Sequence, residues 1–592
     1  MSRGKGQGWP FSRDNSHDGG DPRPRRAAHA IPRVSGILDS HAGTRLSSAT
    51  RVGWNVAMSR LPVSGMPAEV VVDVGPLSPV EVVAVARHGA RVRLSDAAVE
   101  AIGQTRRIID DLADDAEAHY GISTGFGALA TTSIPPEKRA QLQRSLIRSH
   151  AAGSGPEVER EVVRALMLLR LSTLATGRTG VRVRTAQVYV DLLNAGISPV
   201  VREYGSLGCS GDLAPLAHCA LAVMGEGTVR VGAGAGADDW AETQEGEPVP
   251  AAEALARAGI APVELAEKEG LALINGTDGM LGMLLLALHD LDTLLVTADI
   301  SAAMSVEGQL GTDDVFAADL HELRPHPGQG ASAANLRAVM ADSPIRDSHR
   351  DPDACTRVQD AYSLRCSPQV HGSARDTCEH ARLVASRELA SAIDNPVVTL
   401  DGRVESNGNF HGAPVAHVLD FLAVVVADVA SIAERRSDRF LDVARNHGLP
   451  PFLADDPGTD SGLMIAQYTQ AAIVSELKRL AAPASVDSIP SSAMQEDHVS
   501  MGWGAARKLR RAVDGLARVL AVEILTAARA IDLRAPLTPA PATGAVIALL
   551  RQAGVEGPGP DRHLSPEIET AVDLVLDGRV RAVAESAAGP LH

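Results

Sequence analysis

The sequence predicts a mainly α-helical protein, in which a bundle of long helices follows a smaller N-terminal domain. Five segments repeat apolar residues at the helical period with few breaks: 276–311, 375–394, 413–446, 461–482 and 501–534. Aromatic residues make up only 3% of the chain, so the core must consist mainly of Ala, Leu and Val, which favours packed helices. Segments this long and apolar cannot satisfy themselves alone, and we therefore expect a bundle that is shared between subunits.

Shorter elements precede the bundle. Ser95 is the expected N-cap of an early helix. The segment 119–127 contains three glycines, which is typical of a loop that approaches another group closely. Further helices are expected to end at Gly153 and to occupy 156–195, and residues 229–250, rich in Gly, Ala and acidic side chains, are predicted to form a surface loop.

Composition divides the 592 residues into four parts. Residues 1–65 are rich in Arg, Gly, Ser and Pro and carry ten Lys or Arg against four Asp or Glu, so we expect a disordered extension, with Met66 as the true start. The remaining parts are an N-terminal domain at 66–275, the central long-helix bundle at 276–540 and a C-terminal tail at 541–592 with one or two short helices.

Charge and cysteine usage exclude several classes of protein. A net charge of −17 argues against binding to nucleic acid or to a membrane surface, although the basic segment 23–26 leaves a nucleic-acid patch or a transit segment as the alternative for the extension. The five cysteines are odd in number and lack a CxxC pair, which indicates reduced thiols in the cytoplasm. The apolar run 279–296 contains one His and two Asp, so we predict a buried helix and no membrane span.

One stretch organises the chain: Gly-Ser-Leu-Gly-Cys-Ser-Gly-Asp-Leu-Ala-Pro-Leu-Ala-His at 205–218. Asp212 suits the first turn of a helix, so Cys209, Ser210 and Gly211 form a tight turn before a helix N-terminus. Because Gly211 has no Cβ, its amide nitrogen can bend toward the carbonyl carbon of Cys209 and close a five-membered ring. Loss of water from Ser210 would then leave a methylidene electrophile. The alternative is a helix-capping turn with an inert buried cysteine.

The sequence segments around this turn resemble the prosthetic-group loop of the histidine/phenylalanine ammonia-lyase family. Further sequence motifs are similar to those of the family and occur in the same order, at 119–127, 144–153, 268–277, 358–369, 407–412 and 494–501. The resemblance covers the chain from about Met66 to the tail and is closest to the actinobacterial branch. Family loops most often read Ala-Ser-Gly, so Cys209 is a variation, at a position that contributes its backbone carbonyl to the ring.

The resemblance implies a long-helix bundle of the fumarase/aspartase-like superfamily. It also implies a homotetramer whose active sites are assembled from several subunits. Cys209, Ser210 and Gly211 would form the prosthetic group, 4-methylidene-imidazol-5-one, with no external cofactor and no metal. Asp278 stands where the family usually has Gln, and the sequence alone offers no physical reason for this change.

Residue roles follow from the same resemblance. Tyr120 would be the base that takes the β-proton of the substrate, and Arg365 would bind the substrate carboxylate with both of its N–H edges. Asn275 and Tyr362 would hold the carboxylate and amine ends of the substrate.

Four further residues complete the implied site. Gln359 and Phe410 would position the prosthetic group and close the pocket. His150 and Glu496 would face the substrate ring, and a carboxylate there suits an imidazole, which has N–H donors.

The implied reaction is the non-oxidative deamination of L-histidine to trans-urocanate and ammonia, the first step of histidine degradation. One alternative is a phenylalanine or tyrosine ammonia-lyase, or a 2,3-aminomutase, on the same scaffold. Another is a helical assembly protein whose Cys-Ser-Gly turn never cyclises. Glu496 favours histidine over phenylalanine or tyrosine.

Overall fold

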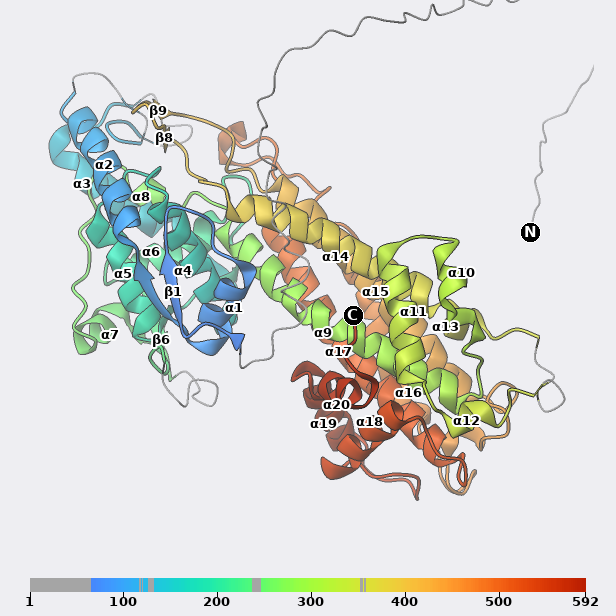
Figure 1. The fold of residues 1–592 in the computed structure, drawn as a ribbon. Helices are drawn as coiled ribbons and strands as arrows, with labels where there is room; N and C mark the ends of the chain where they lie inside the picture. Colours follow the sequence, from blue (N-terminus) through green and yellow to red (C-terminus); the bar gives the residue numbers. More distant parts are fainter. Residues whose placement is uncertain are drawn as a thin grey trace, which may run out of the picture. The chain divides into compact units, whose positions relative to one another are not determined.

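Long α-helices dominate the described part of the chain, which comprises residues 65–115, 119, 121–125, 132–236, 246–351, 355 and 358–592 of this computed structural model (Figure 1). Each predicted bundle segment contains a helix: α9 (Asp278–Gly308), α14 (Ser367–Leu389), α15 (Ala413–Leu441), α16 (Met464–Leu480) and α17 (Gly502–Asp532). The start predicted for α14 at residue 375 was wrong, because Pro368 occupies the first helical turn, where a proline costs no hydrogen bond.

The bundle is built by side-by-side packing of these helices. α17 packs against α9, α15 and α16, while α14 packs against α9 and α15. α9 is apolar on all sides and buried along almost its whole length, as expected of a helix with neighbours all round. α9 and α15 are long and apolar enough to cross a membrane, but 78% and 61% of their most apolar windows lie inside the protein. This burial agrees with the predicted core helix at 279–296.

The N-terminal part surrounds the first turns of α9 with shorter elements. Its helices are α1 (Pro79–His88), α2 (Asp96–Ala113), α3 (Pro136–His150), α4 (Arg160–Ala175), α5 (Val183–Asn194), α6 (Leu213–Val223), α7 (Ala251–Arg257) and α8 (Glu269–Ala272). The Ser95 hydroxyl accepts a hydrogen bond from the Ala98 amide, which confirms the predicted N-cap of α2. α4 packs between α1 and α9 and links the two parts.

Small sheets complete this part. β1 (Glu69–Val72) pairs in parallel with β2 (Arg91–Leu94), and β3 (Ser154–Glu157) pairs antiparallel with β5 (Arg202–Tyr204). β4 (Ile197–Pro199), β6 (Thr228–Val231) and β7 (Val249–Pro250) form an antiparallel sheet. The predicted surface loop at 229–250 was therefore wrong at both of its ends. A short pair, β8 (Val397–Val398) with β9 (Val404–Glu405), lies farther along the chain.

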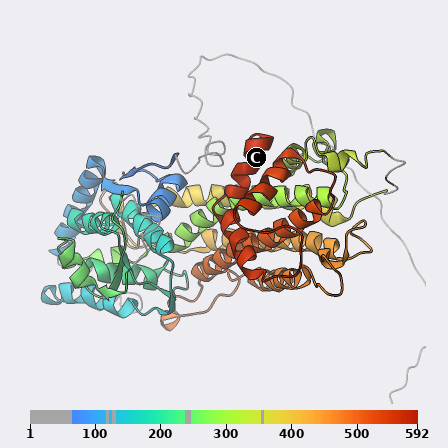
Figure 2. The same cartoon turned by 90° about the horizontal axis from the view of Figure 1, so that it is seen from below.

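The remaining helices flank the far end of the bundle. They are α10 (Ala318–Glu322), α11 (Pro327–Val339), α12 (Pro344–Asp347), α13 (Tyr362–Arg365), α18 (Pro541–Gln552), α19 (Ser565–Leu576) and α20 (Arg579–Ala588). The tail therefore holds more helix than the one or two short helices predicted, because apolar residues of α19 and α20 are buried. Figures 1 and 2 show these red helices against the bundle, where α19 packs on α17 and α20 on α9.

Candidate active site

The predicted prosthetic-group turn lies against the start of α9. Gly211 has φ +77° and forms an isolated parallel bridge to Gly276, and the Asp212 amide donates to the Gly276 carbonyl at 2.7 Å. A Cβ added at Gly211 would lie 2.0 Å from that carbonyl oxygen, which no side chain tolerates. The backbone thus forms a cradle that only glycine fits. This close approach suits a ring that needs an unhindered amide at Gly211.

Asp212 fixes this turn to the bundle. Its side chain makes no cap on α6, which it precedes, and Oδ2 instead accepts the amides of Gly279 and Met280 at 2.9 Å each. The Ser206 hydroxyl donates to Oδ1 at 2.9 Å. Complete burial raises the pKa of Asp212 to about 7. Two helix N-termini therefore meet at one turn, and sequence reasoning missed that the carboxylate serves the second of them.

The segment before α17 forms another wall. The Ser500 hydroxyl donates to the Gly208 carbonyl at 2.7 Å, and the Met501 amide donates to the Leu207 carbonyl at 2.8 Å. The Gly412 amide also donates to the Gly208 carbonyl, at 3.3 Å, which brings the loop carrying half-buried Phe410 to the same turn. The structure thus brings two distant motifs of the sequence together at the turn: the segment before α17 and the loop that carries Phe410.

Glu496 contacts the turn directly. Its Oε1 accepts the Ser210 hydroxyl at 3.0 Å, and its Oε2 accepts the Cys209 thiol at 3.1 Å. Burial and the charge of Glu496 raise the pKa of Cys209 to about 12, so the thiol stays protonated. A carboxylate is therefore placed beside the atoms that would become the electrophile.

His150 and Asn275 lie nearby. His150 is the last residue of α3, and its Nδ1 lies 2.9 Å from the Leu146 carbonyl. Burial lowers the pKa of His150, while the charge of Glu496 acts in the opposite direction. Asn275 is buried at the turn before α9, as predicted, and its Nδ2 donates to the Asn395 carbonyl at 2.9 Å.

Buried charges support the turn before α9. Arg170 lies 3.4 Å from Asp278 and donates to the Ile393 carbonyl at 3.0 Å. Burial raises the pKa of Asp278, and the charge of Arg170 opposes this rise, so Arg170 is the neighbour that accommodates an acid at this position. Lys268 and Asp394 form a fully buried pair at 2.5 Å. Sequence reasoning missed these partners, although the unusual Asp278 could have prompted a search for a buried cation.

Tyr362 and Arg365 lie at the other end of the bundle. The Arg365 guanidinium carbon sits 4.8 Å from the Tyr362 ring centre, and the tyrosine side chain is 70% exposed. α13, which carries both residues, packs beside α9, α14 and α15. Arg436 donates to the Ser363 carbonyl and its own carbonyl accepts Gln309, which follows the last residue of α9.

Ser210 lies beside the first turn of α9, so nearly the full length of this helix separates it from Arg365. At about 1.5 Å per residue, the 31-residue helix spans roughly 45 Å. Figure 1 shows α6 and α13 at opposite ends of α9. One chain therefore does not bring Arg365 and Tyr362 to Ser210. Gln359, three residues before Tyr362, is exposed, and Tyr120 lies outside the described residues.

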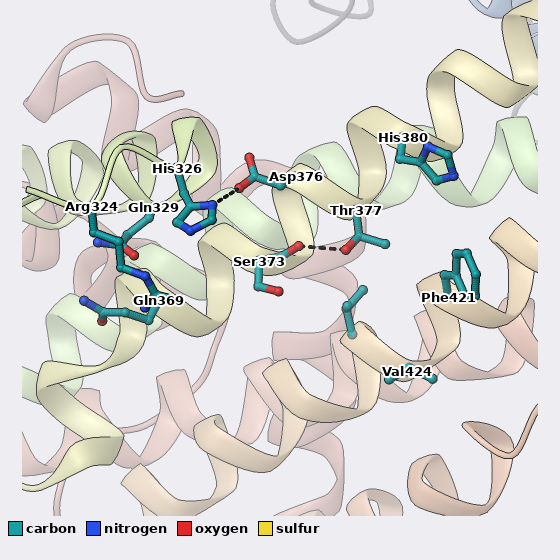
Figure 3. Close-up of a pocket in the computed structure, with 11 residues that line it drawn as sticks. Arg324, His326, Gln329, Gln369, Ser373, Asp376, Thr377, His380, Phe421 and Val424 are labelled. Carbon is teal, nitrogen blue, oxygen red and sulfur yellow. Dashed lines mark hydrogen bonds and ion pairs between the residues drawn. The ribbon is translucent and has the colours of Figure 1, made fainter. Parts of the chain in front are cut away.

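Among the hollows of the described surface, two differ in their relation to the predicted site. One, of about 410 Å³, borders the prosthetic turn through Ser500 and is lined by His411, His417 and His498 among others. The other, of about 550 Å³, lies between α11, α14 and α15 (Figure 3). His326 and Asp376 lie 3.9 Å apart on its lining, and none of the predicted site residues lines it. Within the ranges described above, no group of three His, Cys, Asp or Glu side chains could hold a metal ion.

Comparisons with known proteins agree with this geometry. A sequence model of the family described as aromatic amino acid lyase matches residues 77–552. The histidine ammonia-lyase of Streptomyces coelicolor is 66% identical over 523 residues, which cover 88% of this chain and 99% of that protein.

Solved structures show the same fold. The histidine ammonia-lyase of Trypanosoma cruzi matches with a TM-score of 0.78 at 37% identity, over 88% of this chain and 95% of its own. A tyrosine aminomutase of Streptomyces globisporus matches with a TM-score of 0.81 at 36% identity, over 88% of this chain and 100% of its own. The fold predicted from the sequence is thus confirmed, and the chain belongs to the aromatic amino acid lyase family.

Proposed function

We propose that this chain is an ammonia-lyase that converts L-histidine to trans-urocanate and ammonia. The observation that carries the proposal is the contact between the Glu496 carboxylate and the Ser210 hydroxyl at 3.0 Å. An acceptor for an imidazole N–H would thereby lie next to the proposed electrophile. The name of the Streptomyces coelicolor relative supports the same substrate.

The carboxylate of Glu496 discriminates between substrate rings. An imidazole donates an N–H to it, whereas a phenyl ring would leave a desolvated carboxylate without a partner, at a cost of about 1–3 kcal/mol. His150 is half-buried, and the charge of Glu496 acts on its pKa. This histidine would pack beside the same ring.

We propose that Cys209, Ser210 and Gly211 form 4-methylidene-imidazol-5-one. This ring supplies an electrophilic carbon that turns the substrate amino group into a better leaving group. Gly211 provides the unhindered amide, and Asp212 holds it against Gly276. Tyr120 is the proposed base, and a tyrosine in this role needs a pKa below its ordinary value of about 10.

The substrate carboxylate needs a cation, and Arg365 is the proposed partner. Because Arg365 and Ser210 lie at opposite ends of α9, we propose that a second subunit supplies Arg365, Tyr362 and Gln359. Asn275 and Phe410 would come from the subunit that carries the turn.

A homotetramer would place these residues together, and the bundle offers apolar surface for the contacts. Large apolar side chains that are about half exposed or more lie along α14, α15 and α16: Leu383, Phe421, Val424, Ile465 and Tyr468. The five cysteines are all unpaired, which supports the proposed cytoplasmic location.

The test is the appearance of urocanate absorbance when the purified protein meets L-histidine. Ser210→Ala is the control, and intact mass reports whether the protein has lost two waters. Activity in wild type alone, together with that mass loss, is the expected result. A β-amino acid product would indicate an aminomutase, and absence of both turnover and mass loss would refute the proposal.

A further inference from the structure

The carboxylate of Glu496 is held by three side-chain donors in the uncyclised chain. Ser210 donates to Oε1 at 3.0 Å, whereas Cys209 and Ser491 both donate to Oε2 at 3.1 Å. The two oxygens therefore differ. Oε1 depends on a hydroxyl that ring formation would remove, and Oε2 is held by two groups that ring formation leaves intact.

Ring closure would change only one side of this arrangement. The Ser210 hydroxyl leaves as water together with the Cα hydrogen of the same residue. The first water takes the carbonyl oxygen of Cys209 with one hydrogen from the Gly211 nitrogen and one from the Ser210 nitrogen. The Cys209 thiol takes no part in either step. Oε1 of Glu496 is thus released, while Oε2 keeps its donors.

We propose that the Cys209 thiol is a positioning residue for substrate recognition: it holds Oε2 of Glu496, so that the released Oε1 faces the imidazole N–H of the substrate. The inference rests on the proposed function and adds to it a role for a side chain that the ring itself does not use. Cys209 would act through Glu496, without touching the reacting atoms.

The state of the thiol supports this role. Cys209 is buried, and its pKa of about 12 keeps the sulfur protonated at neutral pH, as a donor must be. A thiolate would repel the carboxylate, and no positive side chain is found beside this pair among the contacts of the described residues.

The backbone around Glu496 supports it as well. The Ser491 amide donates to the Glu496 carbonyl at 2.9 Å and the Glu496 amide donates back at 3.3 Å, which closes a short loop. Inside this loop Ser492, Ala493 and Met494 have φ of +51°, +53° and +70°. Three consecutive non-glycine residues in the left-handed region persist only where contacts hold them. The backbone of Glu496 is therefore fixed, and Cys209 together with Ser491 holds the end of its side chain.

The first experiment measures the contact itself, on the full chain and without activity. The S–H stretching band lies in an infrared region free of other protein bands, and the difference between wild type and Cys209→Ser isolates the band of Cys209. Glu496→Gln replaces the charged acceptor with a weaker neutral one, so the band should move to higher wavenumber. An unmoved band would overturn the inference.

The second experiment measures the role. Cys209→Ala should still lose two waters by intact mass, because the ring uses only its backbone carbonyl. Its KM for L-histidine should rise about fivefold with little change in kcat, the loss expected of one hydrogen bond of ordinary strength, since a thiol is a weak donor. Cys209→Ser should restore KM, since a hydroxyl can donate in the same place. Cys219→Ala, a buried thiol in α6, is the matched control and should leave KM unchanged.

Each outcome decides between the two claims. An unchanged KM in a fully cyclised Cys209→Ala protein would refute the inference and leave the proposed function standing. A Cys209→Ala protein that keeps its waters would also refute it, because the thiol would then serve ring formation. If wild type makes no urocanate, the proposed function fails, and the infrared band still reports whether the thiol holds Glu496.

Discussion

Asp212 binds the backbone of Gly279: Oδ2 accepts its amide at 2.9 Å, and the next amide, of Met280, at the same distance. The carboxylate sits directly after the prosthetic turn in the sequence but serves the first turn of α9. A 31-residue helix of the bundle thus sets the position of the turn. The proposed ring formation would require this position to be held within a fraction of an ångström.

Replacing Asp212 should therefore impair both stability and maturation. Asp212→Ala leaves two buried amides without partners, and each unpaired amide should lower the free energy of unfolding by about 1–3 kcal/mol. The turn also loses its link to α9. We expect a lower unfolding midpoint and a smaller fraction of protein that has lost two waters by intact mass.

Asp212→Asn is the matched control, because its oxygen can still accept both amides and its NH2 can donate to Ser206. It should cyclise much more fully than the alanine variant. Complete cyclisation of Asp212→Ala would show that the capping contact is dispensable.

Gly211 should tolerate no side chain. Gly211→Ala would place a Cβ 2.0 Å from the Gly276 carbonyl oxygen, so the turn must move and the ring should not form. Gly259→Ala is the control, since Gly259 has a similar φ of +69° but open space around it. The control should cost only about 1–2 kcal/mol of backbone strain. Urea unfolding and intact mass measure both effects, and equal losses in the two variants would argue against the cradle.

Local signals accounted for much of the fold. Apolar periodicity located the long helices, and Ser95 marked the start of α2, because both depend on residues close in sequence. The start of α14 was misplaced because Pro368 indicates a break in an irregular stretch but also suits a first helical turn. The strands β6 and β7 were missed because each is short and pairs with a distant partner.

Distant contacts in the site were beyond the sequence. The order of the sequence motifs assigned Arg365 and Ser210 to one predicted site, but it could not show that α9 separates these two residues within a chain. The contact of Asp212 with α9 depends on how two helix starts meet, which no local pattern specifies. The hydrogen bonds from Cys209 and Ser210 to Glu496 are likewise seen only in the three-dimensional structure.

Shared sites predict complementation between inactive variants. Ser210→Ala would lack the proposed electrophile and Arg365→Ala would lack the proposed partner of the substrate carboxylate, so each variant alone should be inactive. If one subunit supplies Ser210 and another supplies Arg365, co-expression in equal amounts should restore about one quarter of the wild-type sites by random assembly. Urocanate formation by the co-purified protein measures this.

The control mixes two variants on the same contributing surface, Arg365→Ala with Tyr362→Phe. This mixture should restore no active site. Arg365 and Tyr362 come from the same subunit, and neither variant chain carries both residues as wild type. Failure of the first pair to recover activity, with assembly verified by mass, would contradict shared sites.

Glu496 should control substrate choice. Glu496→Gln keeps the shape but removes the charge, so kcat/KM for L-histidine should fall by a factor equivalent to about 1–3 kcal/mol, while L-phenylalanine should lose less or improve. The neighbouring Asp497 is exposed, and Asp497→Asn should leave both values unchanged. Equal losses on both substrates would mean that Glu496 does not read the ring.

Asp299, in the middle of α9, should govern stability in acid. Burial alone would raise the pKa of Asp299, but the charge of Arg375 and the hydrogen bond from His371 outweigh it and lower the pKa to about 2. The unfolded pKa is about 3.9, so the folded state favours the ionised form. This contribution is fully present above about pH 4 and is lost as the pH falls toward 2, and it amounts to about 2–3 kcal/mol.

The stability gap between wild type and Asp299→Asn should therefore narrow by about 2 kcal/mol as the pH is lowered from 4 toward 2, as measured by urea unfolding. Asp401 is the control, because Arg403 and Thr399 also lower its pKa to about 2, yet it is exposed. Water screens the pair at Asp401, so the gap between wild type and Asp401→Asn should change much less with pH than the gap for Asp299→Asn. A gap for Asp299→Asn that stays constant through this range would show that the buried carboxylate titrates as it does in the unfolded chain.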